Sequence, residues 1–438
     1  MRTYGRFNVF QRMMLRWREL HPYNPVHVVH VPQALDTERL RACIAERVEA
    51  LGLTGLVVDT TRGRFRYEGG PAQTELQVHE ARGAPLAALS RAIEREFNRP
   101  FSAATQEDPF RLLVIDEGSA FYLALAYDHF VASGDSIARL LTGIALSYIR
   151  DEVTTESATV ERYPATYRSV FMRHPLWSIR TILGLPQMSA SARRAHRPPY
   201  SQIEDARNGF SYLRLEPPQL RALLGASKSW GVTLNDLLLA SLMQALSPIA
   251  QERRTEPRRT ELAVASIMNI RQDFRPGGLE VLSPCLAAFR VGHTVPEGIG
   301  LRQLANDVHA MTARIKREHR YLQSIVGLGL SALIWPFLTP SRRHRFYPKH
   351  YPVWAGVTTL NINPVLSRAG GTRTGQLDYL RAVPTGPLCP MVLAATTTHD
   401  VMHIGIAFRT AAFSLSTVER IAAAFVRCID QLPAVSSS

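Results

Sequence analysis

Apolar and polar positions alternate along the first part of the chain in a pattern that predicts several strands and helices. Short runs rich in β-branched and aromatic residues favour strands, and they occur at 26–31, 56–60, 110–116 and 120–127. Segments with apolar residues at helical spacing predict helices, and these lie at 37–51, at 90–99, ending before Pro100, and at 135–149. The last two strands are close enough in sequence to form a hairpin.

The middle of the chain breaks this pattern. Residues 166–207 are rich in Arg, Ser and Pro and have poor periodicity, which is typical of a connection between packed units. We expect this segment to be a crossover linker. It would join an N-terminal lobe, residues 1–165, to a C-terminal lobe, residues 208–438.

The second half returns to alternating elements. Helices are predicted at 217–230, 233–250, 301–322 and 416–432. Strands are predicted at 261–270, 283–292, 353–363, 377–384, 391–399 and 401–409. Because both halves combine strands and helices, the expected fold class is α/β, with two lobes that are each a mixed sheet flanked by helices. The length of 438 residues agrees with two lobes, since single cores stop growing at about 250–300 residues.

Composition and charge narrow the classes of partner. Hydrophobic residues make up 46% and charged residues 20% of the chain, as in an ordinary globular protein. The formal net charge of +14 favours an anionic partner such as nucleic acid, an anionic membrane surface, coenzyme A or an acidic carrier protein. The preference of a GC-rich genome for Arg explains the same charge without a partner. No aromatic–basic interleaving or zinc-finger spacing supports nucleic acid, and no glycine-rich phosphate loop supports nucleotide chemistry.

Cysteine usage and the N-terminal sequence indicate the compartment. Cys43, Cys285, Cys389 and Cys428 lie far apart without metal-binding spacing, so we expect reduced thiols in a cytoplasmic protein. The first twenty residues lack the apolar core of a signal peptide. Their apolar residues recur at helical spacing and predict an amphipathic helix packed on its own domain.

The longest apolar run is Ile325–Leu338, which contains Pro336. It is too short to span a bilayer as a helix. Two interpretations remain. The run is a buried core helix, or it is a surface that contacts acyl chains or lipid, a peripheral membrane contact that the basic sequence at 341–350 favours.

The segment DHFVASG at 128–134 holds the histidine best placed for chemistry, because it follows a predicted strand and precedes a glycine. This segment resembles the HHxxxDG signature of the CoA-dependent acyltransferase superfamily, which includes chloramphenicol acetyltransferase, the condensation domains of nonribosomal peptide synthetases, plant BAHD acyltransferases and wax ester synthases. Three further stretches, at 230–246, 266–274 and 353–363, are similar to family motifs in the same order. The last resembles the strand that crosses between the lobes. The resemblance covers nearly the whole chain and implies an active-site tunnel between two chloramphenicol-acetyltransferase-like lobes.

His129 is the candidate general base. A neutral imidazole with a pKa near 6.5 suits a base at neutral pH, and the resemblance implies that His129 deprotonates the acceptor. The other interpretation is a buried, hydrogen-bonded histidine in a turn. Asp128 replaces the first histidine of the signature, and successive strand residues point to opposite faces. Gly134 fits a close turn.

The acid of the signature is replaced by Ser133. In the family that acid pairs with the arginine to which Arg271 corresponds. Because a buried, unpaired guanidinium is costly, Arg271 must pair with another acid or reach solvent. Asp135 and Asp128 are the candidate acids. Asp135 is equally well explained as a residue that stabilises the start of the following helix.

The second lobe offers a hydroxyl for the oxyanion. The resemblance to chloramphenicol acetyltransferase places a hydroxyl donor at Thr359, although strand propensity alone explains a threonine there. Asn361 lies on the same strand face and is a candidate for orienting a substrate. Asn235 and Asp236 open a helix, and helix-start electrostatics explain both without chemistry.

The resemblance implies an acyltransferase that moves an acyl group from a CoA or carrier-protein thioester to a hydroxyl or amine acceptor, forming an ester or an amide. The acyl-CoA or phosphopantetheine-linked donor is then a co-substrate and no cofactor is bound. Basic residues that could face an acidic carrier, or only solvent, are Arg193, Arg194, Arg197, Arg342, Arg343 and Arg345. The alternative, which Ser133 favours, is a non-catalytic scaffold or docking protein of the same fold in a biosynthetic pathway.

Overall fold

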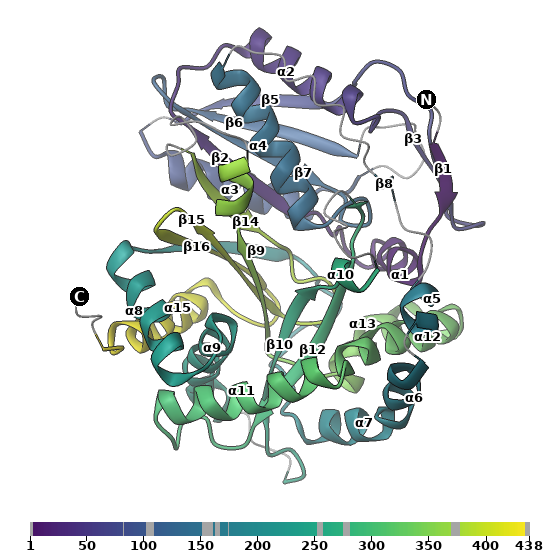
Figure 1. Ribbon diagram of the computed structural model, residues 1–438, viewed down its shortest axis with the longest axis vertical. Helices are drawn as coiled ribbons and strands as arrows, with labels where there is room; N and C mark the ends of the chain where they lie inside the picture. Colours follow the sequence, from purple (N-terminus) through teal and green to yellow (C-terminus); the bar gives the residue numbers. More distant parts are fainter. Residues whose placement is uncertain are drawn as a thin grey trace.

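The computed structural model shows two α/β lobes packed against each other (Figure 1). It describes residues 3–81, 83–101, 109–150, 161–162, 167–173, 175–251, 257–274, 281–368 and 377–433.

The first lobe is built on a five-stranded sheet with the strand order β14-β2-β7-β6-β5. Its strands are β2 (Val26–Val31), β5 (Glu75–Glu80), β6 (Phe110–Asp116), β7 (Phe121–Tyr127) and β14 (Asp378–Ala382). Its helices are α1 (Val9–Trp17), α2 (Thr37–Ala50), α3 (Pro85–Asn98) and α4 (Gly134–Arg150). A small sheet beside them contains β1 (Thr3–Arg6), β3 (Leu56–Asp59) and β4 (Arg64–Tyr67). The amphipathic N-terminal helix expected from the sequence is therefore confirmed as α1.

Alternate residues of the central strands enter two different cores. On β6, Leu112 and Val114 pack into the large cluster that includes residues of α2 and α4. Leu113 and Ile115, between them, pack into a second cluster with residues of α3. A strand covered on both faces must be apolar at every position, which is why 110–116 reads as a nearly continuous apolar run.

The second lobe is built on a six-stranded sheet with the order β12-β10-β13-β15-β16-β9. Its strands are β9 (Asn208–Leu215), β10 (Leu262–Asn269), β12 (Leu286–His293), β13 (Ala355–Asn361), β15 (Met391–Thr398) and β16 (Val401–Arg409). Its main helices are α8 (Pro217–Trp230), α9 (Leu234–Gln251), α11 (Leu301–Arg317) and α15 (Leu415–Asp430). Shorter elements are β8 (Glu161–Arg162), α10 (Arg271–Phe274), β11 (Val281–Leu282) and α14 (Asn363–Arg368).

The strand that crosses between the lobes is β14. The sequence resemblance placed that crossing at 353–363, and this expectation is wrong, because β13 lies inside the second sheet between β10 and β15. β14 leaves the second lobe and pairs antiparallel with β2 of the first. It also lies directly against the second sheet, since a Cβ atom added at Gly405 of β16 would be 2.2 Å from the carbonyl oxygen of Arg381.

Gly405→Ala is therefore expected to lower the free energy of unfolding by about 1–3 kcal/mol, the usual range for overpacking. The new methyl group would meet backbone, which cannot rotate away. Urea unfolding of both proteins measures the loss. Gly329→Ala is the matched control, because a Cβ atom there has open space around it, and equal stability of the two variants would contradict the close approach of β14.

The expected linker is more regular than its sequence pattern indicated. The described residues of 166–207 form α5 (Arg168–Arg173), α6 (Pro175–Leu183) and α7 (Leu185–Arg194). Their apolar side chains do not show core-facing periodicity because many of them are exposed. The long apolar run forms α12 (Gln323–Ile334) and η2 (Trp335–Phe337), preceded by η1 (Arg320–Leu322) and followed by α13 (Pro340–His350). One side of this run is buried and the other is exposed to solvent. The expectation of a buried core helix is therefore confirmed for the buried side alone.

In the described part of the chain, no single helix has the length and apolar character needed to cross a bilayer. The pair α8 and α9 passes such a test together, but the two helices are bent by 106°. All four cysteines are free thiols, as their spacing predicted.

Candidate active site

The histidine loop, residues 128–133, joins the end of β7 to the start of α4. Two hydrogen bonds between the backbone of this loop and the N-terminal segment hold the loop in place. The amide of His129 donates to the carbonyl oxygen of Tyr23 at 3.1 Å, and Gln11 of α1 donates from Nε2 to the carbonyl oxygen of Phe130 at 3.0 Å. The loop is therefore fixed by α1, an element more than a hundred residues away in sequence.

The imidazole of His129 is held in one tautomer. Its Nδ1 lies 3.1 Å from the carbonyl oxygen of Ala132. A carbonyl oxygen only accepts, so Nδ1 carries the proton and Nε2 of the neutral ring carries the lone pair. The rings of Tyr23 and Tyr127 pack against it, with ring centroids at 5.0 and 5.9 Å. The result is a neutral histidine with its basic nitrogen on the side away from the loop backbone.

Burial makes this histidine a weaker base than the sequence suggested. Desolvation lowers the pKa of His129 to about 4, although its backbone hydrogen bonds oppose the shift. The expectation of a pKa near 6.5 is therefore wrong for the closed site, because only 6% of the residue is exposed to solvent. His129 is nevertheless neutral, and so competent to accept a proton, across the physiological range.

This shift predicts how stability depends on pH. The unfolded histidine binds a proton below about pH 6.5 and the folded one only below about pH 4, so His129 destabilises the protein as pH falls through that window, by about 3 kcal/mol in total. The variant His129→Gln lacks this loss. Urea unfolding of both proteins at pH 7 and pH 4 measures the difference, and an identical change in the two proteins would contradict the burial of a neutral imidazole.

Asp128 faces away from the histidine, as expected for its neighbour. Its carboxylate pairs with Arg18 at 3.0 Å from Nη1 to Oδ2. Burial raises the pKa of Asp128 to about 6, and the Arg18 charge opposes that rise. Asp128 is therefore engaged on the first-lobe side of the loop and is not the partner of Arg271.

Arg271 forms an ion pair with Asp135, which takes the place of the acid that Ser133 replaces in the signature. Its Nη1 donates to Oδ2 of Asp135 at 2.9 Å, and its Nη2 donates to the hydroxyl oxygen of Ser133 at 2.5 Å. Asn269 donates to the same Asp135 oxygen. The expected contact between Arg271 and Asp135 is confirmed, and Ser133 keeps a hydrogen bond where the family has an ion pair. The loop is thus tied to the second lobe across the interface.

A cavity of about 240 Å³ lies at the lobe interface, beside the contact between Arg271 and Asp135. It is lined by Gly134, Asp135, Asn235, Ser266, Ile267, Met268, Asn269, Lys316, Thr358, Thr359 and Arg381. Both lobes contribute, since Gly134 begins α4 and Thr359 is on β13. The structure therefore brings Gly134, Asp135 and Thr359 together, as the sequence resemblance implied.

Sequence reasoning missed Arg381, a buried cation in the wall of this cavity. Its Nε donates to the hydroxyl oxygen of Thr396 at 2.9 Å, and its Nη2 donates to the carbonyl oxygens of Ala395 and Thr358. Burial lowers its pKa. Its Nη1 lies over Gly134, where an added Cβ atom would be 3.3 Å away. An isolated arginine in an apolar strand gave no signal, because its partners come from β13 and β15.

Two further candidate residues have structural roles. The side-chain oxygen of Asn361 accepts from the amide of Asn363 at 3.0 Å, and Asn361 does not line the cavity. Asp236 accepts from the amide and the hydroxyl of Thr233 and from Thr312, which agrees with the helix-start interpretation. Asn235 lines the cavity and donates to the hydroxyl oxygen of Ser266 at 3.2 Å.

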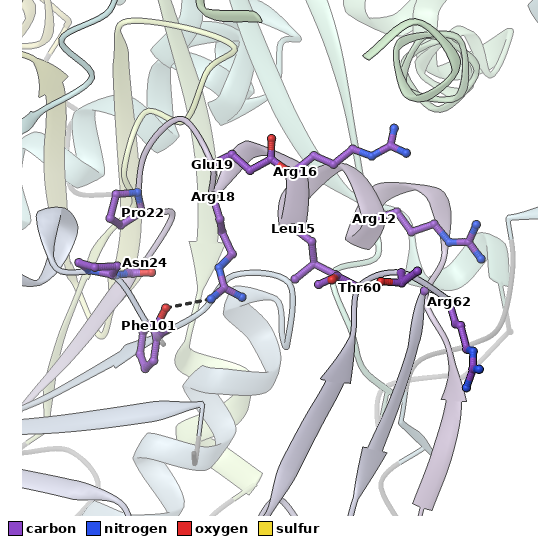
Figure 2. A pocket seen from close by; sticks show the side chains of 13 residues that line it. Arg12, Leu15, Arg16, Arg18, Glu19, Pro22, Asn24, Thr60, Arg62 and Phe101 are labelled. Carbon is purple, nitrogen blue, oxygen red and sulfur yellow. Dashed lines mark hydrogen bonds between the residues drawn. The ribbon is translucent and has the colours of Figure 1, made fainter. Parts of the chain in front are cut away.

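A second, larger hollow of about 600 Å³ lies on the other side of the histidine loop. It is lined by Arg12, Leu15, Arg16, Arg18, Glu19, Pro22, Asn24, Thr60, Thr61, Arg62, Gly63, Pro100 and Phe101. Figure 2 shows Arg18 turned inward toward Phe101, whereas Arg12 and Arg62 point away from it. The inward arginine is the partner of Asp128. The hollow therefore ends beside the histidine loop.

His129 lies between these two spaces and lines neither of them. The ring of Tyr23, which follows Pro22 of the larger hollow, packs on one side of it. His27, whose imidazole lies near Gly134 of the smaller cavity, contacts the ring of Tyr127. A tunnel that joins the two spaces at His129 stays a prediction.

Comparison with known proteins places this geometry in a fold. No family model and no curated protein matches the sequence. Solved structures do match along almost the whole chain. The first condensation domain of the calcium-dependent antibiotic synthetase, in complex with a substrate analogue, is 13% identical with a TM-score of 0.70, covering 100% of this chain and 98% of that one.

Two other similar structures extend the comparison. The starter condensation domain of rhizomide synthetase, in complex with C8-CoA, is 12% identical with a TM-score of 0.66, and the match covers 98% of this chain and 95% of that one. The X-domain from teicoplanin biosynthesis is 16% identical with a TM-score of 0.61, covering 97% and 94%. At these identities the likeness concerns the fold. The chain has the two-lobed fold of the condensation domains, which is the fold expected from the sequence resemblance.

Proposed function

We propose that the protein catalyses a condensation-type acyl transfer, from a thioester donor to a hydroxyl or amine acceptor, with His129 as general base. The observation that carries the proposal is the fixed tautomer of His129 at the lobe interface. Its Nδ1–H is used by the carbonyl oxygen of Ala132, so the lone pair of Nε2 is reserved for an incoming proton. A histidine that only stabilises the turn would form the same Nδ1–H bond, and turnover of the variant His129→Ala distinguishes the two roles.

The proton and electron balance of the reaction needs no further reagent. The acceptor O–H or N–H gives its proton to Nε2 of His129 as the oxygen or nitrogen attacks the thioester carbon. The tetrahedral intermediate then collapses, its C–S bond breaks, and the leaving thiolate takes the proton back from the imidazolium. The products are an ester or amide and a free thiol, and the histidine is regenerated.

The intermediate carries a negative oxygen, which needs a donor in place before the reaction. Thr359 is the candidate that the family resemblance supplies, and it lines the interface cavity. Arg381 adds a fixed positive charge to the same cavity wall. Both groups are supported by strands rather than by loops, which favours a preorganised site.

A phosphopantetheine thiol, on coenzyme A or on a carrier protein, is the donor group that we propose. Among the proteins with this fold, the starter condensation domain of rhizomide synthetase is known in complex with C8-CoA. The net charge of +14 favours such anionic donors. The acceptor is a small hydroxyl or amine compound.

The proposal is tested by product formation. The protein is incubated with a panel of acyl-CoAs and acyl carrier proteins, each with and without candidate alcohols and amines, and products are identified by mass spectrometry. The expected result is a product whose mass is the sum of acyl group and acceptor, with release of free thiol. Binding of a donor without turnover across the panel would contradict the proposal.

A docking function is the second candidate, and one observation favours it. The X-domain from teicoplanin biosynthesis has this fold and is known in complex with OxyB, so the fold can serve as a docking partner. The deep burial of His129 is compatible with that role. The same panel separates the two functions, since a scaffold forms complexes that the variant His129→Ala leaves unchanged.

A further inference from the structure

The apolar face of this protein is a group of exposed hydrophobic side chains on neighbouring helices. Fifteen large hydrophobic residues are exposed in the described part of the chain, and nine of them belong to two segments. The nine, which define the apolar face, are Met172, Leu176, Ile179, Ile182, Leu183, Leu330, Leu333, Ile334 and Phe337. Phe337 is 85% exposed and Leu183 is 74% exposed. Contiguous patches of this kind mark interaction sites.

Helix geometry explains why these residues face outward. On α6, Trp177 and Thr181 point inward, where Trp177 stacks on His319 at 3.3 Å between ring centroids and the carbonyl oxygen of Thr181 accepts from Gln323. The other large apolar residues of α6, which are Leu176, Ile179, Ile182 and Leu183, are exposed to solvent. On α12 and η2, the four exposed residues follow the spacing i, i+3, i+4 and i+7, which is one face of a helix.

The two groups lie on the same side of the molecule. α6 packs against α5 and against α12, and α7 packs against both α6 and α13. Figure 1 shows these helices gathered at one end of the second lobe, at the edge where α1 of the first lobe also lies. The apolar face is therefore a surface of several adjacent helices and not a set of scattered residues.

The excess positive charge of the protein is concentrated in these same segments. Residues 162–203 contain seven Arg and no Asp or Glu, and residues 319–377 contain six Arg and one Lys, again with no Asp or Glu. The remainder of the chain has 37 basic and 37 acidic residues. The formal net charge of +14 therefore equals the charge of these two segments, which contain the helices of the apolar face and also Arg162 of β8, the strand β13 and the helix α14. Exposed members are Arg168, Arg180, Arg193, Arg194, Arg197, Arg342, Arg345 and Lys349.

We propose that the apolar face binds the surface of an anionic lipid bilayer. Apolar side chains beside Arg and Lys, on two segments that contain no acidic residue, fit the boundary between acyl chains and negatively charged headgroups. Three arginines of these segments, Arg194, Arg320 and Arg343, are paired with glutamates from other elements, which are Glu261, Glu318 and Glu19. Long arginine side chains can follow the apolar residues into that boundary while their guanidinium groups stay at the headgroups. This proposal is independent of the chemistry at His129, because no residue of the interface cavity belongs to the apolar face.

Vesicle sedimentation tests this surface without any substrate. The full chain is mixed with vesicles of phosphatidylcholine alone, or with phosphatidylglycerol added, at low and high salt. The expected result is at least tenfold stronger partitioning to the anionic vesicles, which weakens at high salt. Equal partitioning to both vesicles, or none, would overturn the proposal.

Surface variants locate the contact. The double variant with Leu333→Ser and Phe337→Ser is expected to lose at least tenfold in partitioning, and Arg342→Glu with Arg345→Glu at least as much. Leu415→Ser is the matched control, because Leu415 is 52% exposed on α15, outside the apolar face. All these residues are exposed, so folding is checked simply by thermal melting. If the wild type forms a dimer that the double variant disrupts, and neither binds vesicles, a second copy covers the face and the proposal is wrong.

Discussion

His129→Ala is expected to lower kcat about 1,000-fold, within the usual contribution of a general base, with little change in KM for the donor. The reason is geometric. The lone pair of Nε2 is held in place by the bond from Nδ1–H to Ala132. The measurement is steady-state turnover with a substrate pair found in the product panel.

Two variants sharpen the interpretation of that loss. His129→Gln keeps a hydrogen-bond donor and acceptor near the same volume but cannot act as a base, so its kcat should fall as far as that of His129→Ala. His350→Ala, at an exposed histidine of α13, should retain full turnover. Activity of His129→Gln within tenfold of the wild type would show that the imidazole positions a substrate and does not accept its proton.

Asp135→Asn is expected to lower the free energy of unfolding by about 2 kcal/mol, because it leaves the buried guanidinium of Arg271 without a carboxylate. The pair is 2.9 Å long, with 5% of the arginine side chain and 28% of the aspartate side chain exposed. The partial exposure of Asp135 keeps the loss below that of a fully buried pair. Urea unfolding measures it, and Asp59→Asn, in a largely exposed pair with Arg62, should change stability by less than about 0.5 kcal/mol.

The position of Ser133 provides a compensating change. Its hydroxyl oxygen is 2.5 Å from Nη2 of Arg271, so Ser133→Asp would return a carboxylate to the guanidinium from the other side. In the Asp135→Asn background it should recover most of the lost stability. A further loss of stability on adding Ser133→Asp would contradict the interpretation that a carboxylate at either position 133 or position 135 can pair with Arg271.

Much of the site was predictable from sequence because its residues lie in short motifs. The buried Arg271 required an acid, and only Asp128 and Asp135 were close to the altered position, so the confirmed contact followed from the cost of an unpaired charge. Asp236 likewise serves its helix start, as its place in the chain indicated. Such inferences need only the local sequence and one electrostatic rule.

The rest depends on contacts between distant segments. The pKa of His129 falls to about 4 because Tyr23 and its surroundings exclude water from the ring, and the motif does not reveal that burial. The position of Arg381 in the cavity wall could not be predicted, because Arg381 lies on β14. That strand was expected to stay in the second lobe, but it pairs with β2 of the first. One part of the apolar face was predicted, because the apolar run at 325–338 suggested contact with lipid. The part on α6 was not predicted, because that helix lies in a segment with poor periodicity.

The most direct test of the central claim is a crystal structure with a non-hydrolysable acyl-CoA analogue and the acceptor bound together. The account predicts the acceptor oxygen or nitrogen at about 2.6–3.2 Å from Nε2 of His129, the range for a general base, with the thioester carbonyl facing the cavity of Thr359 and Arg381. A complex in which both ligands are bound and the acceptor atom lies on the far side of Tyr23, out of reach of Nε2, would contradict it.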